Sequence, residues 1–255
     1  MNSNASSTTF AKVPAVTLGF WLIKILATTL GETGGDALSM TYDFGYLASS
    51  AIFIVPMLLL IAAQIRAEQF KPWLYWATII ASTTAGTTMA DFATRDLGIG
   101  YPGGSLLLLT AVLACLAIWY RTLGSIDVGT VSDPKTEAFY WATITFSQTL
   151  GTALGDWVAD SGPGYLGAAA LFGAALALVA ILWLRTSLSK AMLFWAAFIL
   201  TRPLGATVGD FLDKPLDKGG LDLSRPLASL VLAVLIAALI WLLPQRAGQH
   251  PQGRS

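Results

Sequence analysis

The sequence predicts an all-α membrane protein with eight transmembrane helices, arranged as four tandem helical hairpins in one parallel orientation with pseudo-symmetry. Three observations lead to this prediction: an apolar composition, eight apolar runs of membrane-spanning length, and one motif that occurs four times. Of the 255 residues, 55% are hydrophobic and only 12% are charged, about half the charged fraction of a typical soluble domain. The mean hydropathy is +0.65, which indicates a polytopic membrane protein with the lipid bilayer as its partner.

The eight apolar runs are the candidate spans, because about 20 residues cross the hydrocarbon core of a bilayer. They lie at approximately 14–36, 46–65, 73–93, 104–120, 136–158, 165–184, 190–212 and 226–243. The spans pair into repeats at approximately 14–66, 72–121, 136–185 and 190–244, within a single polytopic domain over residues 1–255. In each repeat the first span carries the motif and is called the A helix here. The second span, the B helix, is more uniformly aliphatic.

The motif begins with an aromatic residue and a Trp, and the Trp is counted as position 0. The four motif Trp residues are Trp21, Trp76, Trp141 and Trp195. A Gly follows at position 10, and these residues are Gly31, Gly86, Gly151 and Gly205. An Asp follows at position 15, and these residues are Asp36, Asp91, Asp156 and Asp210. The glycines are expected to let another helix approach closely.

Position 8 carries a hydroxyl in three of the four copies, as Thr29, Thr84 and Thr149. Positions 8, 12 and 15 fall on one face of a helix. Each A helix therefore carries a stripe of small hydroxyl residues that ends in a carboxylate. We expect the A helices to line the centre of the bundle with these stripes and the B helices to lie outside them, in fourfold or two-plus-two pseudo-symmetry.

Ionisable residues inside the spans need a reason, because a charge at membrane depth costs at least about 2.5 kcal/mol on insertion scales. They are Lys24, Glu32, Asp36, Asp91, Asp156, Arg202 and Asp210, and they sum to −3 if all are ionised. Glu32 and Asp36 are spaced i, i+4 and share a helix face. Arg202 is expected to neutralise a carboxylate or to act as a tethered cation. Lys24 is expected to extend to the membrane surface.

The residue types limit the chemistry of the site. The spans contain no His and one Cys, Cys115, so the available ligands are oxygen atoms, which suit Mg²⁺, Ca²⁺, Mn²⁺, Na⁺ or protons. We expect Glu32 and Asp36 to be the primary metal ligands. Asp91, Asp156 and Asp210 are expected to complete the site or to carry coupling protons, and the position-8 threonines to line the path.

The function that this pattern favours is secondary transport of a small hard cation, with efflux of a manganese-like divalent metal as the leading hypothesis. Two alternatives stay open: a carrier of a small polar organic solute or cation, and a membrane scaffold that transports nothing. Each motif Asp could also simply cap a hairpin turn. The sequence carries no catalytic motif, so an enzyme is not expected. A net charge of zero gives no nucleic-acid footprint, no resident cofactor is expected, and the oligomeric state is open.

The distribution of Lys and Arg predicts the orientation in the membrane. Nine lie in the N-terminal segment, the links between repeats and the C-terminal segment, and four lie in the hairpins inside the repeats. The nine are Lys12, Arg66, Lys71, Arg121, Lys135, Arg185, Lys190, Arg246 and Arg254; the four are Arg95, Lys214, Lys218 and Arg225. Both termini are therefore expected in the cytoplasm, with the motif Asp residues about 22 Å further out than the motif Trp residues, at 1.5 Å per residue.

The fourfold motif resembles a family of bacterial inner-membrane proteins built from four tandem repeats of two transmembrane segments, a family of unknown function. The motif Trp and Asp residues carry the resemblance, which covers about residues 15–243. It implies the repeat count and a multi-pass location in the bacterial inner membrane. It implies no substrate.

Overall fold

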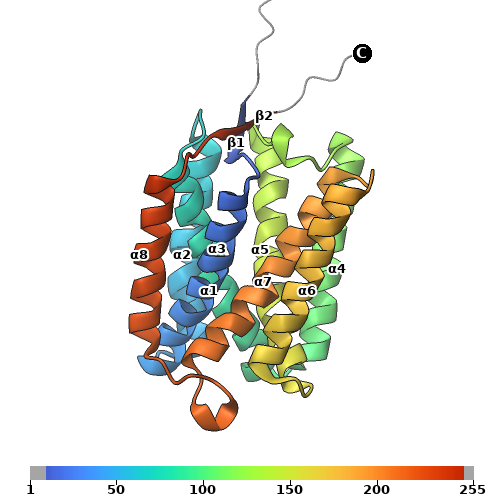
Figure 1. Cartoon of the computed structure of the whole chain (residues 1–255). Helices are drawn as coiled ribbons and strands as arrows, with labels where there is room; N and C mark the ends of the chain where they lie inside the picture. The colour runs from blue at the N-terminus through green and yellow to red at the C-terminus, as the bar shows by residue number, and fades with distance from the viewer. Residues whose placement is uncertain (1–9, 250–255) are drawn as a thin grey trace, which may run out of the picture.

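The computed structural model describes residues 10–249, which form eight long helices and one small sheet (Figure 1). The A helices are α1 (Leu18–Asp36), α3 (Pro72–Asp91), α5 (Pro134–Asp160) and α7 (Lys190–Asp213). The B helices are α2 (Gly45–Arg66), α4 (Gly100–Leu123), α6 (Gly164–Arg185) and α8 (Arg225–Leu242). All eight lie where the sequence predicts spans. Arg254 and the two ends of the predicted 1–255 domain lie outside the described residues.

Two helix starts differ from the prediction by four residues. Helix α4, predicted from about residue 104, begins at Gly100, and α1, predicted from about residue 14, begins at Leu18. Pro14 is instead the last residue of strand β1 (Phe10–Pro14). Thr17 then caps the helix, because its side chain accepts a hydrogen bond from the Phe20 amide. The apolar run therefore begins before the helix does, at the end of a strand that packs on the bundle.

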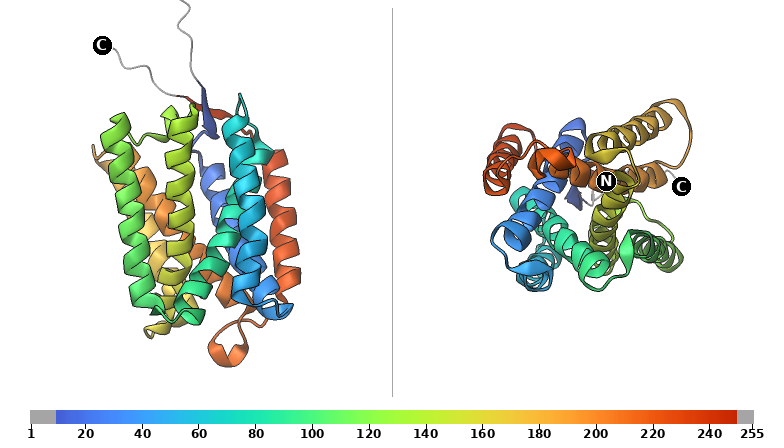
Figure 2. Two further views of the ribbon diagram at one scale, coloured as in Figure 1. Left: turned by 180° about the vertical axis from the view of Figure 1, so that it is seen from behind. Right: turned by 90° about the horizontal axis from the view of Figure 1, so that it is seen from below.

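Helices α1, α3, α5 and α7 form a closed central ring, in which each packs against the one before and the one after and α7 returns to α1. The B helices lie outside this ring, each against the A helix of the next repeat: α2 on α3, α4 on α5, α6 on α7 and α8 on α1. Figure 2, right, shows this arrangement from the end opposite the chain termini. The predicted placement of A helices inside and B helices outside is confirmed.

The position-10 glycines close the ring, because each accommodates the position-7 residue of the following A helix. The four pairs are Gly31 with Thr83, Gly86 with Gln148, Gly151 with Arg202, and Gly205 with Thr28. A Cβ atom placed on Gly205 would lie 2.9 Å from the backbone carbonyl carbon of Thr28, closer than real carbon atoms approach. The absence of a side chain at position 10 therefore sets the distance between neighbouring A helices.

An aromatic collar closes the end of the ring that carries the chain termini, here called the terminal end. The residue before each motif Trp packs against the motif Trp of the next repeat. Ring centroids are 5.5 Å apart for Phe20 and Trp76, 5.8 Å for Tyr75 and Trp141, 6.0 Å for Tyr140 and Trp195, and 5.6 Å for Phe194 and Trp21. The motif Trp residues therefore repeat the same cyclic order of contacts as the glycines, and aromatic pairs of this kind stabilise the packing.

A two-stranded antiparallel sheet ties the two chain ends together at the terminal end, where β1 pairs with β2 (Ala247–Gln249). The Lys12 ammonium reaches from β1 to the buried carboxylate of Glu137 at the start of α5, with an N–O distance of 2.6 Å. It also donates to the Ile65 carbonyl at 3.1 Å. Lys12 thus links the N-terminal strand to both halves of the repeat array.

Five helices in the described part of the chain are long and apolar enough to cross a membrane, namely α2, α4, α6, α7 and α8. This composition is that of a multi-pass membrane protein. Helices α1, α3 and α5 are not among the five, because their axial faces carry Thr, Gly and acidic residues. Apolar composition therefore supports five spans rather than the predicted eight, although the described residues form eight long helices.

The tight contact at position 10 predicts that Gly205→Ala lowers the free energy of unfolding by about 1–3 kcal/mol, because the added methyl group meets the backbone of Thr28. Gly173→Ala in α6 is the matched control, since a Cβ there meets nothing within 4 Å. It should leave the stability unchanged or raise it by about 0.5–1 kcal/mol. Unfolding of the purified variants in detergent measures both, and equal effects would contradict this account of the ring.

Candidate functional site

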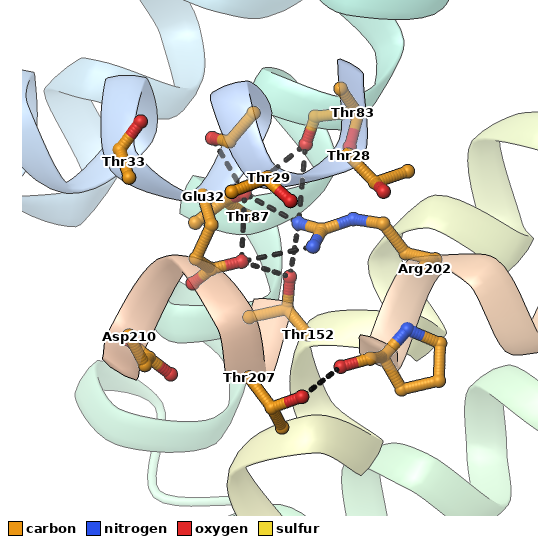
Figure 3. A network of polar contacts seen from close by, with 12 residues as sticks. Thr28, Thr29, Glu32, Thr33, Thr83, Thr87, Thr152, Arg202, Thr207 and Asp210 are labelled. Carbon is orange, nitrogen blue, oxygen red and sulfur yellow. Dashed lines mark hydrogen bonds and ion pairs between the residues drawn. The ribbon is translucent and has the colours of Figure 1, made fainter. Parts of the chain in front are cut away.

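The guanidinium group of Arg202 lies at the centre of the ring and contacts all three other A helices (Figure 3). It donates to the Glu32 carboxylate of α1 at 2.9 Å, to the Thr87 hydroxyl of α3 at 2.6 Å and to the Thr152 hydroxyl of α5 at 2.5 Å. Arg202 is fully buried and Glu32 is 2% exposed. The four helices of the ring are therefore joined at one charged point that is withdrawn from water and lipid.

Three carboxylates form a group beside this point. One oxygen each of Glu32, Asp156 and Asp210 lie within 4.8 Å of one another, and all three residues are buried. This group is called the inner triad. Oxygen atoms at such separations are the ligand type that hard cations such as Mg²⁺, Ca²⁺ and Mn²⁺ take from proteins, so the inner triad is a candidate cation site.

Towards the opposite end of the bundle, here called the hairpin end, two basic residues bridge the motif Asp residues in pairs. Arg95 contacts Asp91 of its own repeat at 2.8 Å and Asp156 of the next at 2.9 Å. Lys214 contacts Asp210 of its own repeat at 2.9 Å and Asp36 of the next, cyclically, at 2.5 Å. Both cations stand at position 19 of their repeats, so the four Asp residues are tied in two pairs related by a pseudo-twofold axis.

A second group of carboxylates lies at the hairpin end beside Lys214. One oxygen each of Asp36, Asp210 and Asp213 lie within 4.8 Å of one another, and this group is called the outer triad. The guanidinium of Arg225, the first residue of α8, lies 3.4 Å from Asp213 and 3.9 Å from Asp36. The two triads share Asp210, so they form a continuous acidic path from the centre of the ring to its hairpin end.

The five carboxylates predicted to form one metal site are distributed over two triads and one ion pair. Glu32 and Asp36, expected to act together, belong to different triads. Asp91 belongs to neither triad and is paired with Arg95. Asp156 and Asp210 do join Glu32. Arg202 was expected either to neutralise a carboxylate or to act as a tethered cation, and it pairs with the carboxylate of Glu32.

The position-8 threonines do not join the axial network. The hydroxyl groups of Thr29, Thr84 and Thr149 donate to the carbonyl oxygens four residues earlier in their own helices, at 3.0, 2.8 and 3.0 Å. The hydroxyls that reach Arg202 and Glu32 come instead from position 11, as Thr87 and Thr152. The reason is the rotation of the A helices, because packing position 7 against position 10 turns the faces of positions 7 and 11 towards the axis.

The expectation that Lys24 extends to the membrane surface is wrong. Lys24 is fully buried in the ring, where its ammonium lies 4.1 Å from the centroid of the Phe198 ring and 3.4 Å from the Thr201 hydroxyl. None of the described carboxylates lies within ion-pair distance of it. Position 3 faces the axis in the closed ring, so the side chain points inward rather than along the lipid surface.

Sequence reasoning did not assign four charged residues at the hairpin end to the site: Arg95, Asp213, Lys214 and Arg225. Adding Arg95 and Lys214 changes the charge sum of the predicted set from −3 to −1, and adding Asp213 and Arg225 leaves it at −1. Burial alone would lower the pKa of the Lys214 ammonium, but Asp210, Asp36 and Asp213 outweigh it and hold that pKa well above its usual range. The i, i+4 spacings of Asp91 with Arg95 and Asp210 with Lys214 were the available signal.

The buried pair of Glu32 and Arg202 predicts strong non-additivity between their variants. Glu32→Gln or Arg202→Met alone leaves one buried charge without its partner and should lower the free energy of unfolding by about 3–5 kcal/mol. The double variant should lose clearly less than the sum of the two. Thr29→Val is the control, with a loss of about 1 kcal/mol. Additive losses in detergent unfolding would show that the pair is not coupled.

Removal of the buried Lys24 charge is predicted to raise the stability rather than to lower it, because a buried charge without a carboxylate partner is destabilising. Lys24→Met should raise the free energy of unfolding by about 1 kcal/mol or more. Lys71→Met, at an exposed position, should change it by less than about 0.5 kcal/mol. A loss of stability in Lys24→Met would mean that the contacts with Phe198 and Thr201 outweigh the cost of burial.

Comparison with known proteins supplies the family but no relative of assigned function. Neither curated proteins nor solved structures give a match to this chain. The model of a family described as Repeat of Unknown Function (DUF347) matches four consecutive segments, residues 19–70, 74–125, 139–189 and 193–247. Each matched segment contains one A helix and one B helix of the ring. The chain therefore belongs to the DUF347 family of tandem two-helix repeats.

Proposed function

We propose that this protein is a secondary transporter that exports a small hard cation, with divalent manganese as the leading candidate substrate. The observation that carries the proposal is the inner triad, in which oxygens of Glu32, Asp156 and Asp210 converge within 4.8 Å at the centre of the ring. Buried carboxylates are costly unless a cation or proton compensates them. A site that can exchange that compensating charge suits transport better than a fixed structural role or catalysis.

Arg202 supplies the exchangeable charge in this proposal. Its guanidinium holds Glu32 at 2.9 Å and acts as a tethered cation that a transported ion must displace. The Cβ and Cγ atoms of Arg202 pack against Gly151, so the proposed movement is confined to the outer part of the side chain and leaves α7 intact. Return of the guanidinium to Glu32 favours release of the ion. Competition of this kind makes binding reversible, as a transporter requires. Coupling protons would be carried by the carboxylates at the hairpin end, among them Asp36 and Asp91.

The proposed setting is the bacterial inner membrane, with all eight helices crossing it and both termini in the cytoplasm. Helices α1, α3 and α5 can span despite their polar residues, because those residues face the ring and the B helices cover them from lipid. The hairpin end then faces the outside. External protons reach its carboxylates first, so an inward proton gradient would drive the cation outward.

One observation favours an organic cation as the second candidate substrate. The centre of the ring already binds a planar guanidinium through one carboxylate and two hydroxyls, from Glu32, Thr87 and Thr152. A free guanidinium or a small amine carries the same charge and donors as the Arg202 side chain. Competition between guanidinium and manganese in a flux assay separates the two substrates.

The test is manganese flux into liposomes that contain the purified protein and a metal-quenched dye, with and without an acidic interior. We expect quenching that the acidic interior accelerates, because outward protons drive manganese inward in this geometry. Glu32→Gln should reduce the flux to that of protein-free liposomes, since it removes the carboxylate of the inner triad that pairs with Arg202. Glu68→Gln, at an exposed position in the link before α3, is the matched control and should retain the flux.

Full manganese flux in folded, inserted Glu32→Gln would overturn the assignment of the inner triad. Flux of guanidinium that manganese does not inhibit would move the substrate class to organic cations. Absence of any flux in tight liposomes with folded protein would favour the scaffold interpretation, in which the charges only hold the ring together.

A further inference from the structure

We propose that the outer triad of Asp36, Asp210 and Asp213 is a separate binding site for a hard divalent cation, and that binding there displaces the ammonium group of Lys214. This adds a binding step at the hairpin end that transport through the inner triad does not itself require. Lys214 now occupies the position of the ion, with its nitrogen 2.5 Å from Asp36 and 2.9 Å from Asp210.

The carboxylates of the outer triad retain unused ligand capacity. Asp36, Asp210 and Asp213 are at most 4% exposed, and one oxygen of each lies within 4.8 Å of the others. Oδ1 of Asp36 and Oδ1 of Asp213 have neither a hydrogen bond nor an ion pair with residues 10–249, whereas Oδ2 of Asp213 faces Arg225 at 3.4 Å. Buried carboxylate oxygens are normally satisfied, so these two Oδ1 atoms point to a further ligand that donates protons or positive charge.

The charge balance favours exchange of the ammonium for a divalent ion. With all five groups ionised, the three carboxylates contribute −3 and Lys214 and Arg225 contribute +1 each, which leaves a buried excess of −1. If a divalent cation takes the place of the Lys214 ammonium, the three carboxylates, Arg225 and the ion are together neutral. A monovalent cation in the same place would leave the excess unchanged, so the site selects for charge +2.

Lys214 can leave without disturbing the backbone that carries it. It is the first residue after α7, and its own carbonyl accepts from the Asp222 amide at 2.9 Å, while the Leu221 amide donates to Phe211 at 2.8 Å. These bonds fix the base of the hairpin that projects beyond the others at the lower end of Figure 1. The four-carbon lysine stem is flexible, and Lys214, although buried, keeps 7% of its surface exposed.

The equivalent arrangement around Arg95, which the pseudo-twofold axis relates to that around Lys214, shows why the site is confined to the fourth repeat. Arg95 bridges Asp91 and Asp156 as Lys214 bridges Asp210 and Asp36. However, the residue equivalent to Asp213 in that repeat is Thr94, whose hydroxyl donates to the Ala90 carbonyl. A third carboxylate is therefore missing beside Arg95 among the described residues, and a planar guanidinium held by two carboxylates is harder to displace than an ammonium.

The ligands also define the chemical class of the ion. All three side chains offer oxygen, which suits Mg²⁺, Ca²⁺ and Mn²⁺ and disfavours soft metals. Asp210 belongs to both triads, so an ion bound at the outer site lies one shared ligand away from the inner triad. The outer site is thus placed to exchange ions between the centre of the ring and the hairpin end.

The experiment measures exposure of Lys214 in the purified full-length chain in detergent. An amine-reactive reagent is applied with and without Mn²⁺, and peptide mapping by mass spectrometry gives the modification rate of each lysine. We expect Mn²⁺ to raise the rate at Lys214 about tenfold or more, because a displaced state populated at about 10% or less becomes the majority. Lys218, exposed on the same hairpin, should keep its rate and is the internal control. Sodium chloride at matched ionic strength should have no effect.

Two variants locate the ligand set. Asp213→Asn should abolish the Mn²⁺-dependent increase at Lys214, whereas Asp217→Asn, at an exposed position of the same hairpin, should retain it. Glu32→Gln should also retain it, because Glu32 belongs only to the inner triad. Loss of flux in Glu32→Gln with a persistent increase at Lys214 therefore tests the two proposals separately.

An unchanged rate at Lys214 in folded protein saturated with Mn²⁺ would overturn the proposal, as would an increase that persists in Asp213→Asn. If Asp213→Asn does not fold, the comparison of Lys214 with Lys218 in the unaltered chain decides the outcome by itself. Flux that depends on Glu32 without any response of Lys214 would leave transport through the inner triad standing and remove the outer site.

Discussion

The close approach of the four A helices at their position-10 glycines is the constraint on which the rest of the structure depends. Each glycine accommodates the position-7 residue of the next helix, and repeating this contact four times closes a ring. Closure turns positions 3, 7 and 11 towards the axis, and it brings Glu32, Thr87, Thr152 and Arg202 to one point. The aromatic collar follows the same cyclic order, so two layers of contacts enforce one arrangement.

Buried charge is distributed over this ring with lower symmetry than the backbone. The four motif Asp residues follow the fourfold repeat, but the cations that hold them, Arg95 and Lys214, occur only in the second and fourth repeats and bridge each of these to the repeat that follows it. Glu32 and Arg202 occur once each and reduce the symmetry further. Each position-10 glycine accommodates the side chain at position 7 of the next helix, whether that is Thr, Gln or Arg. The ring therefore keeps one packing geometry while its axial positions diverge and acquire chemistry.

Each acidic triad is paired with a basic side chain of the same chain. Arg202 accompanies the inner triad and Lys214 the outer one, and Asp210 connects the two. A tethered cation keeps a buried carboxylate stable when no ion is bound, and it also lowers the cost of releasing one. The contacts that stabilise the ring are therefore the same ones that the proposed transport would use.

The sequence by itself determined the fourfold repeat, the eight helices and nearly all of their boundaries, because apolar run length and a motif with fixed spacing are local properties. It also identified Glu32, Asp156, Asp210 and Arg202 as buried charges that need partners. Only the tertiary structure decided which residues are partners. It separated Asp36 from Glu32, turned the position-8 threonines away from the axis, buried Lys24, and brought Arg95, Lys214, Asp213 and Arg225 to the motif Asp residues. These outcomes depend on the rotation of each A helix in the closed ring and on how hairpins fold back over its end, and both are set by contacts between residues far apart in the sequence.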